Sequence, residues 1–340
     1  MGYSRFPSWR SDGSFATSAA QGPGRTRFTE GTGRNPAYID AYKASFGVEP
    51  ICRVLRDHDY QIAPSTYYAF KKRPPSARSL SDERLLAEVR CVFYANYECY
   101  GVRKVWQELR HRRVAAGRDQ VARIMRSAGL RGATRLKRVR TTYPEVGAAR
   151  APDLVQRNWS LEAPDTVWVS DFTYVPSREG TVYVSFLQDV FSRRILGFTV
   201  ATSMGAQLVT KALDQAISIR KRTNPSFTGQ GVIVHSDAGS QNTSLAFSQK
   251  LLDHGMAGSI GRVGTAYDNA LIESTIGLYK AELIRPGGRA WTSRQEIETA
   301  TTAWVAWFNE RRLHSKLGYL SPVKYEAAYN QNLDLPRQAA

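Results

Sequence analysis

Apolar residues recur at helical spacing through the front of the chain. In the stretch FGVEPICRVLRDH they fall on one face of a predicted helix, at Val48, Ile51, Val54 and Leu55. After a break at residues 59–63, Pro64 and Ser65 are typical of the opening of a second helix. The run SDERLLAEVRCVFYAN predicts a further helix, with Ser81 as its N-cap.

Two more helices follow and are joined by a short turn. YGVRKVWQELRHRRV and RDQVARIMRSAGL each place apolar residues on one face and basic residues on the other, and AAG (115–117) separates them. Such a pair is typical of a DNA-binding helix-turn-helix. Helical hairpins that bind no DNA are also common, but the arginine density favours DNA. The basic residues expected to contact DNA here are Arg103, Lys104, Arg118 and Arg123.

The pattern changes to strands in the second half. TVWVSDFTYV, TVYVSFLQDVF and RRILGFTVA are β-rich runs with short turns between them, which predicts an antiparallel meander. A helix at about 205–222 leads to the short buried strand GVIVHSD, and helices then alternate with one further short strand up to residue 284. This order predicts an α/β fold, a mixed five-stranded sheet flanked by helices, preceded by an all-α region.

Charge is distributed unevenly along the 340 residues. The net charge is +17, and residues 1–150 hold 28 Lys/Arg against 13 Asp/Glu, while residues 151–340 hold 19 against 17. A front half this basic indicates a nucleic acid partner, although a solvated basic surface is the simpler alternative. Three cysteines are too few for a disulfide framework, and no apolar run reaches membrane-spanning length. We therefore expect no membrane contact and a cytoplasmic, nucleoid-associated protein.

These patterns divide the chain into five expected segments. They are a flexible tail (1–36), a helical helix-turn-helix DNA-binding region (37–135), a linker (136–160), a catalytic core (161–284) and a C-terminal helical, DNA-contacting extension (285–340). In the extension, Trp304, Trp307 and Phe308 have the spacing of a core stripe. The nearby basic residues Arg311, Arg312 and Lys316 are expected to contact DNA, with a solvated face as the alternative.

Three acidic residues carry the candidate chemistry. Asp171 lies in the strand-like run VWVSDFTYV, Asp237 ends the strand GVIVHSD, and Glu273 lies in the helical run YDNALIESTIGLYKAEL. Asp171 and Glu273, each taken alone, are more simply surface charges, whereas Asp237 ends a strand at the edge where α/β sites usually form. Carboxylates from three elements together suit two Mg²⁺ (or Mn²⁺) ions working on a phosphodiester. Asn269, Glu273 and Lys280 share one stripe of the helix, so Asn269 and Lys280 are expected to contact DNA. The sequence has no GxSxG, Walker A or dinucleotide fingerprint, which disfavours those enzyme classes.

Five motifs, in this order and spacing, resemble the integrase-core transposases of bacterial insertion sequences. They are VWVSDFTYV, DVFSRRILGF, HSDAGSQNTS, YDNALIESTIGLYKAEL and WFNERRLHSKLGYLSPVKYEAAY. The nearest kin are the orfB-like proteins of the IS-three family, relatives of retroviral integrases. FGVEPICRVLRDHDYQIAPSTYY and YGVRKVWQEL resemble that family's helix-turn-helix region, so the resemblance covers residues 43–330.

The resemblance implies a mechanism and partners. It implies an RNase H-like catalytic domain in which Asp171, Asp237 and Glu273 are the DDE triad. It also implies metal-dependent cleavage of the element's ends and transfer of the freed 3′-hydroxyl into target DNA. The partners it implies are transposon-end and target DNA, further copies of the chain on that DNA, and an upstream helix-turn-helix and zipper polypeptide.

Two positions depart from the family pattern. Ala238 stands where the family usually has Arg, and Asn242 stands where a Tyr usually follows GSQ. Neither is a metal ligand, but a missing arginine beside the site would weaken the positioning of DNA. Two other function classes therefore stay open. One is a catalytically impaired DNA-binding regulator, which metal-dependent cleavage would exclude. The other is an RNase H-type nuclease, which a strand-transfer product would exclude.

Overall fold

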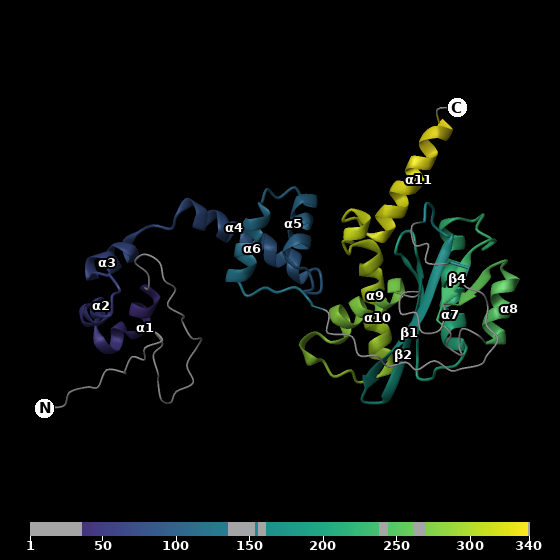
Figure 1. The fold of residues 1–340 in the computed structure, drawn as a ribbon, viewed down its shortest axis with the longest axis horizontal. Helices are drawn as coiled ribbons and strands as arrows, with labels where there is room; N and C mark the ends of the chain where they lie inside the picture. Colours follow the sequence, from purple (N-terminus) through teal and green to yellow (C-terminus); the bar gives the residue numbers. More distant parts are fainter. Residues whose placement is uncertain (1–35, 135–153, 156–160, 238–243, 261–269, 339–340) are drawn as a thin grey trace. The chain divides into compact units, whose positions relative to one another are not determined.

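The computed structural model describes residues 36–134, 154–155, 161–237, 244–260 and 270–338 (Figure 1). The chain divides into two compact units, Met1–Ser81 and Asp82–Ala340. Because the described residues begin at 36 and include only 154–155 of the range 136–160, the tail expected over 1–36 and the linker expected over 136–160 lie almost wholly outside them. The boundary at Ser81 also divides the helical region that we expected to be continuous from 37 to 135.

The first unit contains three short helices. They are α1 (Pro36–Phe46), α2 (Val48–Asp57) and α3 (Pro64–Lys72), and α3 opens at Pro64 as predicted. Their apolar faces meet in a small core that includes Ile39, Leu55 and Tyr67. The Tyr67 hydroxyl donates a hydrogen bond to Asp40 at 2.7 Å, which ties α3 to α1.

Three further helices follow: α4 (Ala77–Tyr94), which spans the boundary between the units, α5 (Val102–His111) and α6 (Arg118–Ser127). The prediction of Ser81 as the N-cap of α4 is wrong, because the helix starts four residues earlier. Ser76 Oγ accepts a hydrogen bond from the Ser79 amide at 3.1 Å, which caps the exposed donors of the first turn. The α5–α6 turn is secured by Trp106, whose Nε1 donates to the Ala116 carbonyl at 2.9 Å.

The sheet has five strands in the order β3-β2-β1-β4-β5. The strands are β1 (Val167–Ser177), β2 (Gly180–Asp189), β3 (Ile195–Ala201), β4 (Ile233–Ser236) and β5 (Ala257–Ile260). β1, β2 and β3 pair antiparallel as the predicted meander, whereas β4 pairs parallel with both β1 and β5. The predicted mixed five-stranded sheet is confirmed.

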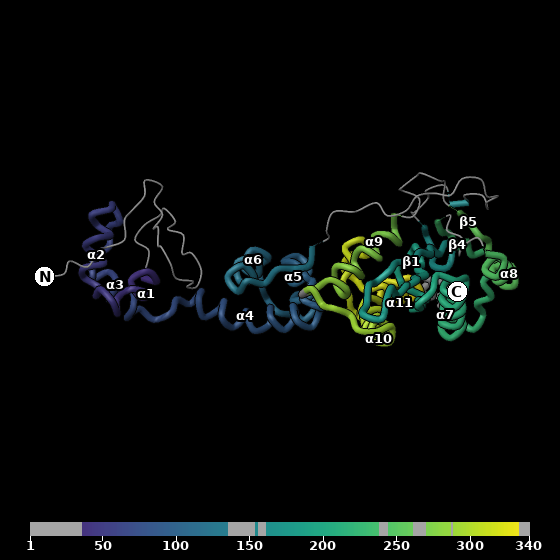
Figure 2. Tube along the Cα trace, turned by 90° about the horizontal axis from the view of Figure 1, so that it is seen from below, coloured from purple at the N-terminus to yellow at the C-terminus, as the bar shows by residue number. Residues whose placement is uncertain are grey.

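Helices cover both faces of the sheet (Figures 1 and 2). α7 (Gln207–Thr223) and α8 (Leu245–Asp253) lie on one face, and α9 (Ala270–Tyr279) and α10 (Arg294–Glu310) lie on the other. α9 continues directly into a π-helix, η1 (Lys280–Ile284). The remaining elements are two 3₁₀ turns, η2 (Pro286–Gly288) and η3 (Ser315–Leu317), and α11 (Pro322–Gln338). None of the helices described here is long and apolar enough to cross a bilayer.

Alternation along β1 separates two apolar clusters. Val167, Val169 and Val175 pack in the cluster with α9 and α10, whereas Trp168 packs in the cluster with α7 and α8. On the second face α7 approaches β3 so closely that only glycine fits at position 197. A Cβ at Gly197 would lie 1.9 Å from the Ala212 carbonyl oxygen.

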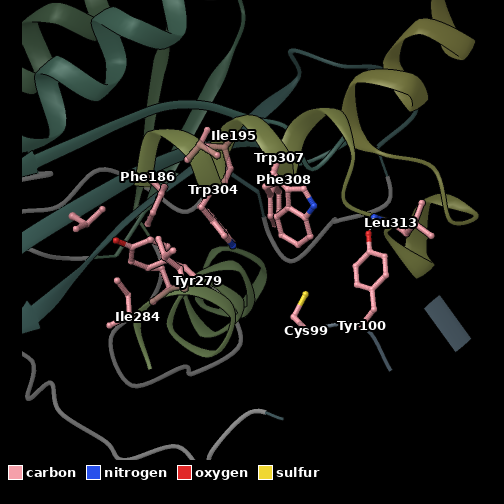
Figure 3. Packing of buried hydrophobic residues seen from close by; sticks show 14 of the residues in the cluster. Cys99, Tyr100, Phe186, Ile195, Tyr279, Ile284, Trp304, Trp307, Phe308 and Leu313 are labelled. Carbon is pink, nitrogen blue, oxygen red and sulfur yellow. Dashed lines mark hydrogen bonds between the residues drawn. The ribbon is translucent and has the colours of Figure 1, made fainter. Parts of the chain in front are cut away.

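The C-terminal segment completes the first cluster and is not a separate layer. Trp304, Trp307 and Phe308 are buried, as the predicted core stripe requires, and they pack with Phe186 of β2 and Tyr279 of α9 (Figure 3). The rings of Tyr279 and Trp304 meet edge to face at 5.2 Å. Residues after 284 are therefore part of the body that carries the sheet.

Candidate active site

The two aspartates of the predicted triad are neighbours across adjacent parallel strands. β1 and β4 are in register up to the pair Ser170 and Ser236. Asp171 is the next residue of β1, and Asp237 directly follows the end of β4. Since side chains alternate, Asp171 lies on the same face as Val169, the face that α9 covers. The sheet thus brings two carboxylates from distant parts of the sequence to one edge.

α9 supplies the third carboxylate. Its buried residues Ile272, Ile276 and Tyr279 pack in the cluster beneath it, which leaves Glu273 half-buried beside them. Thr275 Oγ1 donates to Gln188 Oε1 of β2 at 2.8 Å. This buried bond fixes the helix on the sheet two residues from Glu273.

The three carboxylates share one electrostatic environment. Burial raises the pKa of Asp171 well above its usual value, and the charges of Asp237 and then Glu273 raise it further. The Phe172 amide, which donates to Asp171 Oδ1 at 2.8 Å, and the Lys280 ammonium oppose that rise. Asp171 therefore lies in a field of surplus negative charge that a cation would offset.

Oxygen donors of this kind fit a hard divalent cation. Among the described residues, no three or more His, Cys, Asp or Glu side chains are already grouped to hold a metal ion. Like-charged carboxylates are expected to stand apart until a cation screens them. The segments next to Asp237 and Glu273, residues 238–243 and 261–269, lie outside the described residues, and so do Ala238, Asn242 and the predicted DNA contact Asn269.

Lys280 lies beside the acidic site. Its Nζ is 4.9 Å from the centre of the Tyr174 ring on β1. Burial lowers the pKa of Lys280, Arg285 lowers it further, and the carboxylate of Asp171 opposes the decrease. Lys280 therefore brings one positive charge to the side of the sheet that holds Asp171.

His235 also faces this side of the sheet, two residues before Asp237. Its side chain is buried and its Nδ1 lies 2.9 Å from Ser259 Oγ on β5. The Leu154 amide donates to the same hydroxyl at 3.0 Å. His235 therefore contributes to joining β4 to β5 just behind Asp237.

The basic residues predicted on α5 and α6 differ in their surroundings. Arg103 and Arg118 are exposed, and Arg118 pairs with its neighbour Asp119 at 3.0 Å. Lys104 is half-buried, with its Nζ 5.0 Å from the Tyr100 ring centre. The Arg123 guanidinium binds Asp82 of α4 at 2.6 Å, so it holds α6 against α4.

In the C-terminal segment the prediction of a DNA contact is wrong for Arg312. Arg311 and Lys316 are exposed, but Arg312 is 3% exposed and forms an ion pair with Glu282 of η1. Its neighbour His314 packs edge to face on Phe308, and burial lowers the pKa of His314 to about 2. One feature of the sequence could have indicated this pair: Glu282 lies between the apolar residues Ala281 and Leu283.

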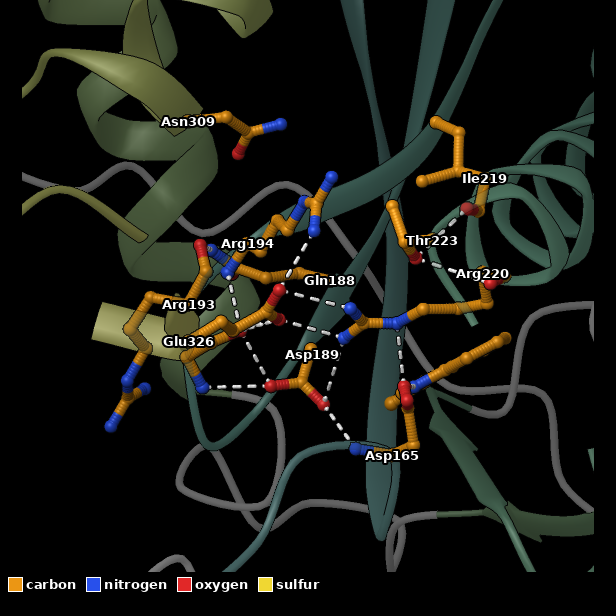
Figure 4. Close-up of polar contacts among 12 residues, drawn as sticks. Asp165, Gln188, Asp189, Arg193, Arg194, Ile219, Arg220, Thr223, Asn309 and Glu326 are labelled. Carbon is orange, nitrogen blue, oxygen red and sulfur yellow. Dashed lines mark hydrogen bonds and ion pairs between the residues drawn. The ribbon is translucent and has the colours of Figure 1, made fainter. Parts of the chain in front are cut away.

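A second charged network escaped the sequence analysis (Figure 4). Arg220 of α7 binds Asp165 at 2.7 Å and Glu326 of α11 at 2.8 Å, and Glu326 also binds Arg194 at 2.7 Å. Asp189, at the end of β2, is fully buried in this network, and burial raises its pKa to about 6. The network joins α7, α11 and the end of β2.

Comparison with protein families gives three matches along the chain. The Integrase core domain family matches residues 162–266, and a second Integrase core domain family matches residues 254–322. The HTH-like domain family matches residues 80–138, which contain most of α4 and all of α5 and α6. Together these matches cover both the sheet with its carboxylates and the basic helices.

Similar proteins come from several bacteria. The putative transposase for insertion sequence element IS986/IS6110 of Mycobacterium tuberculosis (strain H37Rv) is 46% identical over 79% of this chain and 96% of the relative. The transposase for insertion sequence element IS629 of Shigella sonnei is 43% identical over 86% and 95%. Transposase InsF for insertion sequence IS3A of Escherichia coli (strain K12) is 30% identical over 87% and 98%.

Among solved structures, two integrase cores are similar. The HTLV-2 integrase catalytic core domain in complex with magnesium is 17% identical, with a TM-score of 0.35, over 48% of this chain and 98% of that chain. The catalytic core domain of BIV integrase is 15% identical, with a TM-score of 0.35, over 49% and 97%.

Proposed function

The chain belongs to the transposases of bacterial insertion sequences, which carry an RNase H-like integrase core, and we propose that Asp171, Asp237 and Glu273 form its catalytic metal site. The protein is thus an enzyme of the polynucleotidyl transferase type. One observation supports the site assignment: Asp171 and Asp237 directly follow the paired residues Ser170 and Ser236, and the helix bearing Glu273 covers the face of β1 on which Asp171 lies. The raised pKa of Asp171 supports it, because both other carboxylates contribute to the rise.

The proposed cofactor is Mg²⁺ or Mn²⁺, as two ions held by these three carboxylates. When bound, such ions supply Lewis-acid activation of the attacking oxygen and stabilisation of the leaving oxygen. The protein contributes the geometry: β1 and β4 fix two of the holding groups, and α9 brings the third. Lys280 contributes a cation that draws a phosphate toward Asp171 and limits the repulsion between phosphate and carboxylates.

The proposed reaction exchanges phosphodiester bonds in two steps. Water cleaves the bond at the element's end and leaves a free 3′-hydroxyl, which then attacks a phosphodiester of target DNA and releases a new 3′-hydroxyl there. Each step forms one P–O bond and breaks another, so no energy-rich cofactor is needed. The carboxylates would hold the ions, and none of them forms a covalent bond with DNA.

We assign DNA binding to residues in three regions. Arg103, Lys104, Arg118 and Arg123 would contact phosphates through the helices of the 37–135 region, and Arg311 and Lys316 through the segment after α10. Lys280 and Asn269 would contact the strand in the site. Since such contacts displace counterions, affinity should fall steeply with salt. We further propose that the chain assembles with other copies of itself on DNA, acts with an upstream helix-turn-helix polypeptide, and works in the nucleoid.

The test uses purified protein and labelled duplexes that carry the ends of the element, with Mg²⁺. In Asp171→Asn, Asp237→Asn and Glu273→Gln, cleavage and joining should each fall by more than about 100-fold, beyond the loss seen when supporting groups of metal sites are removed. DNA affinity should change little. The control is Asp214→Asn, an exposed carboxylate on α7 that should leave both activities unchanged.

The same assay separates the alternatives. Cleavage without any joined product would favour a nuclease, and binding without cleavage would favour a regulator that has lost its chemistry. Full activity in any one triad variant would remove that residue from the proposed site.

A further inference from the structure

The helix that carries Glu273 is also held from its other side. α9 runs into η1 without a break, because Tyr279 at the junction keeps helical backbone angles. At about 100° per residue along α9, Lys280 returns to the side of Glu273, whereas Glu282, two residues farther into η1, points away from that side. The helix therefore lies between the acidic site on one side and the partner of Glu282 on the other.

That partner is Arg312, and the pair is buried and bidentate. Arg312 Nε donates to the two Glu282 oxygens at 2.9 and 3.1 Å, and Nη2 donates to the same carboxylate. Each side chain is 4% exposed. The guanidinium also lies 5.4 Å from the centre of the Phe308 ring, and the Arg312 amide donates to the Trp307 carbonyl at 2.8 Å. Both ends of the pair are thus fixed in one orientation.

Stability alone does not explain such a pair. Removing two charges from water costs so much that apolar residues of the same volume often stabilise a protein equally well or better. The π-turn that presents Glu282 is itself uncommon and is frequently found at functional sites. Unlike an apolar contact, the pair is directional. The forked guanidinium binds the Glu282 carboxylate with two hydrogen bonds only when the helix has one particular rotation about its axis.

Residues next to the pair also contact the connection between α4 and α5, where Cys99 and Tyr100 lie near Trp307 and Leu313 (Figure 3). Tyr100 accepts a hydrogen bond from the Leu313 amide at 2.8 Å, and Asn96 accepts one from Trp307 Nε1 at 3.0 Å. Cys99 is close enough that the charge of Glu282 adds to burial in raising its pKa to about 12. The basic helices α5 and α6 are therefore connected to the helix of Glu273 through these contacts.

We propose that Glu282 and Arg312 are positioning residues for Glu273, and that they couple the seating of the basic helices to the geometry of the metal site. The proposal rests on the function proposed above. The ion pair sets the rotation of α9 and η1, so that Glu273 and Lys280 face Asp171 together. Without the pair, the helix keeps its apolar packing but loses the contact that selects this rotation.

The test replaces both charges at once, with Glu282→Leu/Arg312→Met, so that no lone charge is left buried. We expect a cooperative melting transition and a DNA dissociation constant close to those of the wild type. Mn²⁺ affinity, measured by calorimetry without turnover, should fall by about 10- to 100-fold, the range for groups that support metal ligands. The kcat of strand transfer should fall similarly while the KM for DNA stays unchanged, a split that general loss of structure does not produce.

The control is Asp214→Leu/Lys250→Met, which removes an ion pair between α7 and α8 on the opposite face of the sheet. It should keep Mn²⁺ affinity and kcat. Wild-type values of both quantities in Glu282→Leu/Arg312→Met would overturn the proposal. If that variant shows no melting transition, Arg312→Lys decides, since it keeps the charge but loses the fork. A folded Arg312→Lys with wild-type kcat would likewise overturn it.

The two proposals fail separately. An active Glu273→Gln variant would remove the metal site itself. Inactive triad variants beside a fully active Glu282→Leu/Arg312→Met would leave the metal site standing and remove only the positioning role.

Discussion

Glu326 is the centre of a buried charged network, and its removal should destabilise the second unit strongly. Its carboxylate accepts four hydrogen bonds, from Arg194 (2.7 Å), from both terminal nitrogens of Arg220 (2.8 and 3.0 Å) and from Ser192 (2.7 Å). In Glu326→Ala, Arg220 keeps Asp165 at 2.7 Å, but the Arg194 side chain, 17% exposed, loses this carboxylate. Breaking a buried pair from one side costs about 3–5 kcal/mol, and the remaining contacts of Arg220 place the expected loss near ~3 kcal/mol.

The assay is denaturant unfolding followed by tryptophan fluorescence, because Trp168, Trp304 and Trp307 are all buried in this unit. Glu298→Ala is the control, since Glu298 pairs with Arg294 at the surface with 45% of its side chain exposed. An exposed pair contributes less than ~1 kcal/mol, so that variant should unfold almost as the wild type does. If the free energy of unfolding of Glu326→Ala is within ~1 kcal/mol of the wild-type value, the network contributes less to stability than expected.

Three further perturbations test other parts of the structure. Gly197→Ala should lower the free energy of unfolding by ~3 kcal/mol or more, because the added Cβ would lie 1.9 Å from the Ala212 carbonyl oxygen. The control is Gly205→Ala, where the added Cβ would have no atom within 4 Å and should change stability little. Equal melting temperatures for the two variants would contradict the close approach of α7 to β3. Thr275→Val should lower the free energy of unfolding by ~1–3 kcal/mol, because the buried Gln188 Oε1 loses its hydrogen-bond donor. Thr302→Val, at an exposed position, is the control and should be nearly neutral. Similar unfolding midpoints for the two variants would argue against the Thr275–Gln188 hydrogen bond. Burial raises the pKa of Asp189 from 3.8 to about 6, so the folded state keeps a proton that the unfolded state releases. The contribution of Asp189 to stability is therefore full below about pH 4 and falls by ~3 kcal/mol as pH rises through 6. Over that range the free energy of unfolding of the wild type should fall by ~3 kcal/mol relative to that of Asp189→Asn. Parallel pH profiles of stability for the two proteins would refute this prediction.

The meander and the mixed sheet were accessible from the sequence because their signals are local. The β-rich runs with short turns predicted the meander, and Asp171 and Asp237 stand at the edge of apolar strands where a carboxylate is conspicuous. Trp304, Trp307 and Phe308 were correctly predicted as core because their spacing matches a helical stripe.

Long-range pairing was not accessible in the same way. Arg312 appears in the basic run ERRLHSK and was assigned to DNA, yet its partner Glu282 lies 30 residues earlier in sequence. Arg220 and Glu326 are separated by 106 residues, and each looks like a surface charge on an amphipathic helix. Ser81 was mistaken for a cap because Ser76, which caps the helix, precedes a stretch with no apolar periodicity.

The central claim is that Asp171, Asp237 and Glu273 bind metal ions at one shared site. Counting the bound Mn²⁺ ions tests this claim directly. Calorimetry or electron spin resonance on the DNA-bound protein should find roughly two Mn²⁺ per chain in the wild type. In the Asp171→Asn/Asp237→Asn/Glu273→Gln variant, these sites should be lost while DNA binding persists. If that variant binds the same number of ions with the same affinity, the metal is held elsewhere and the site described here is not the catalytic one.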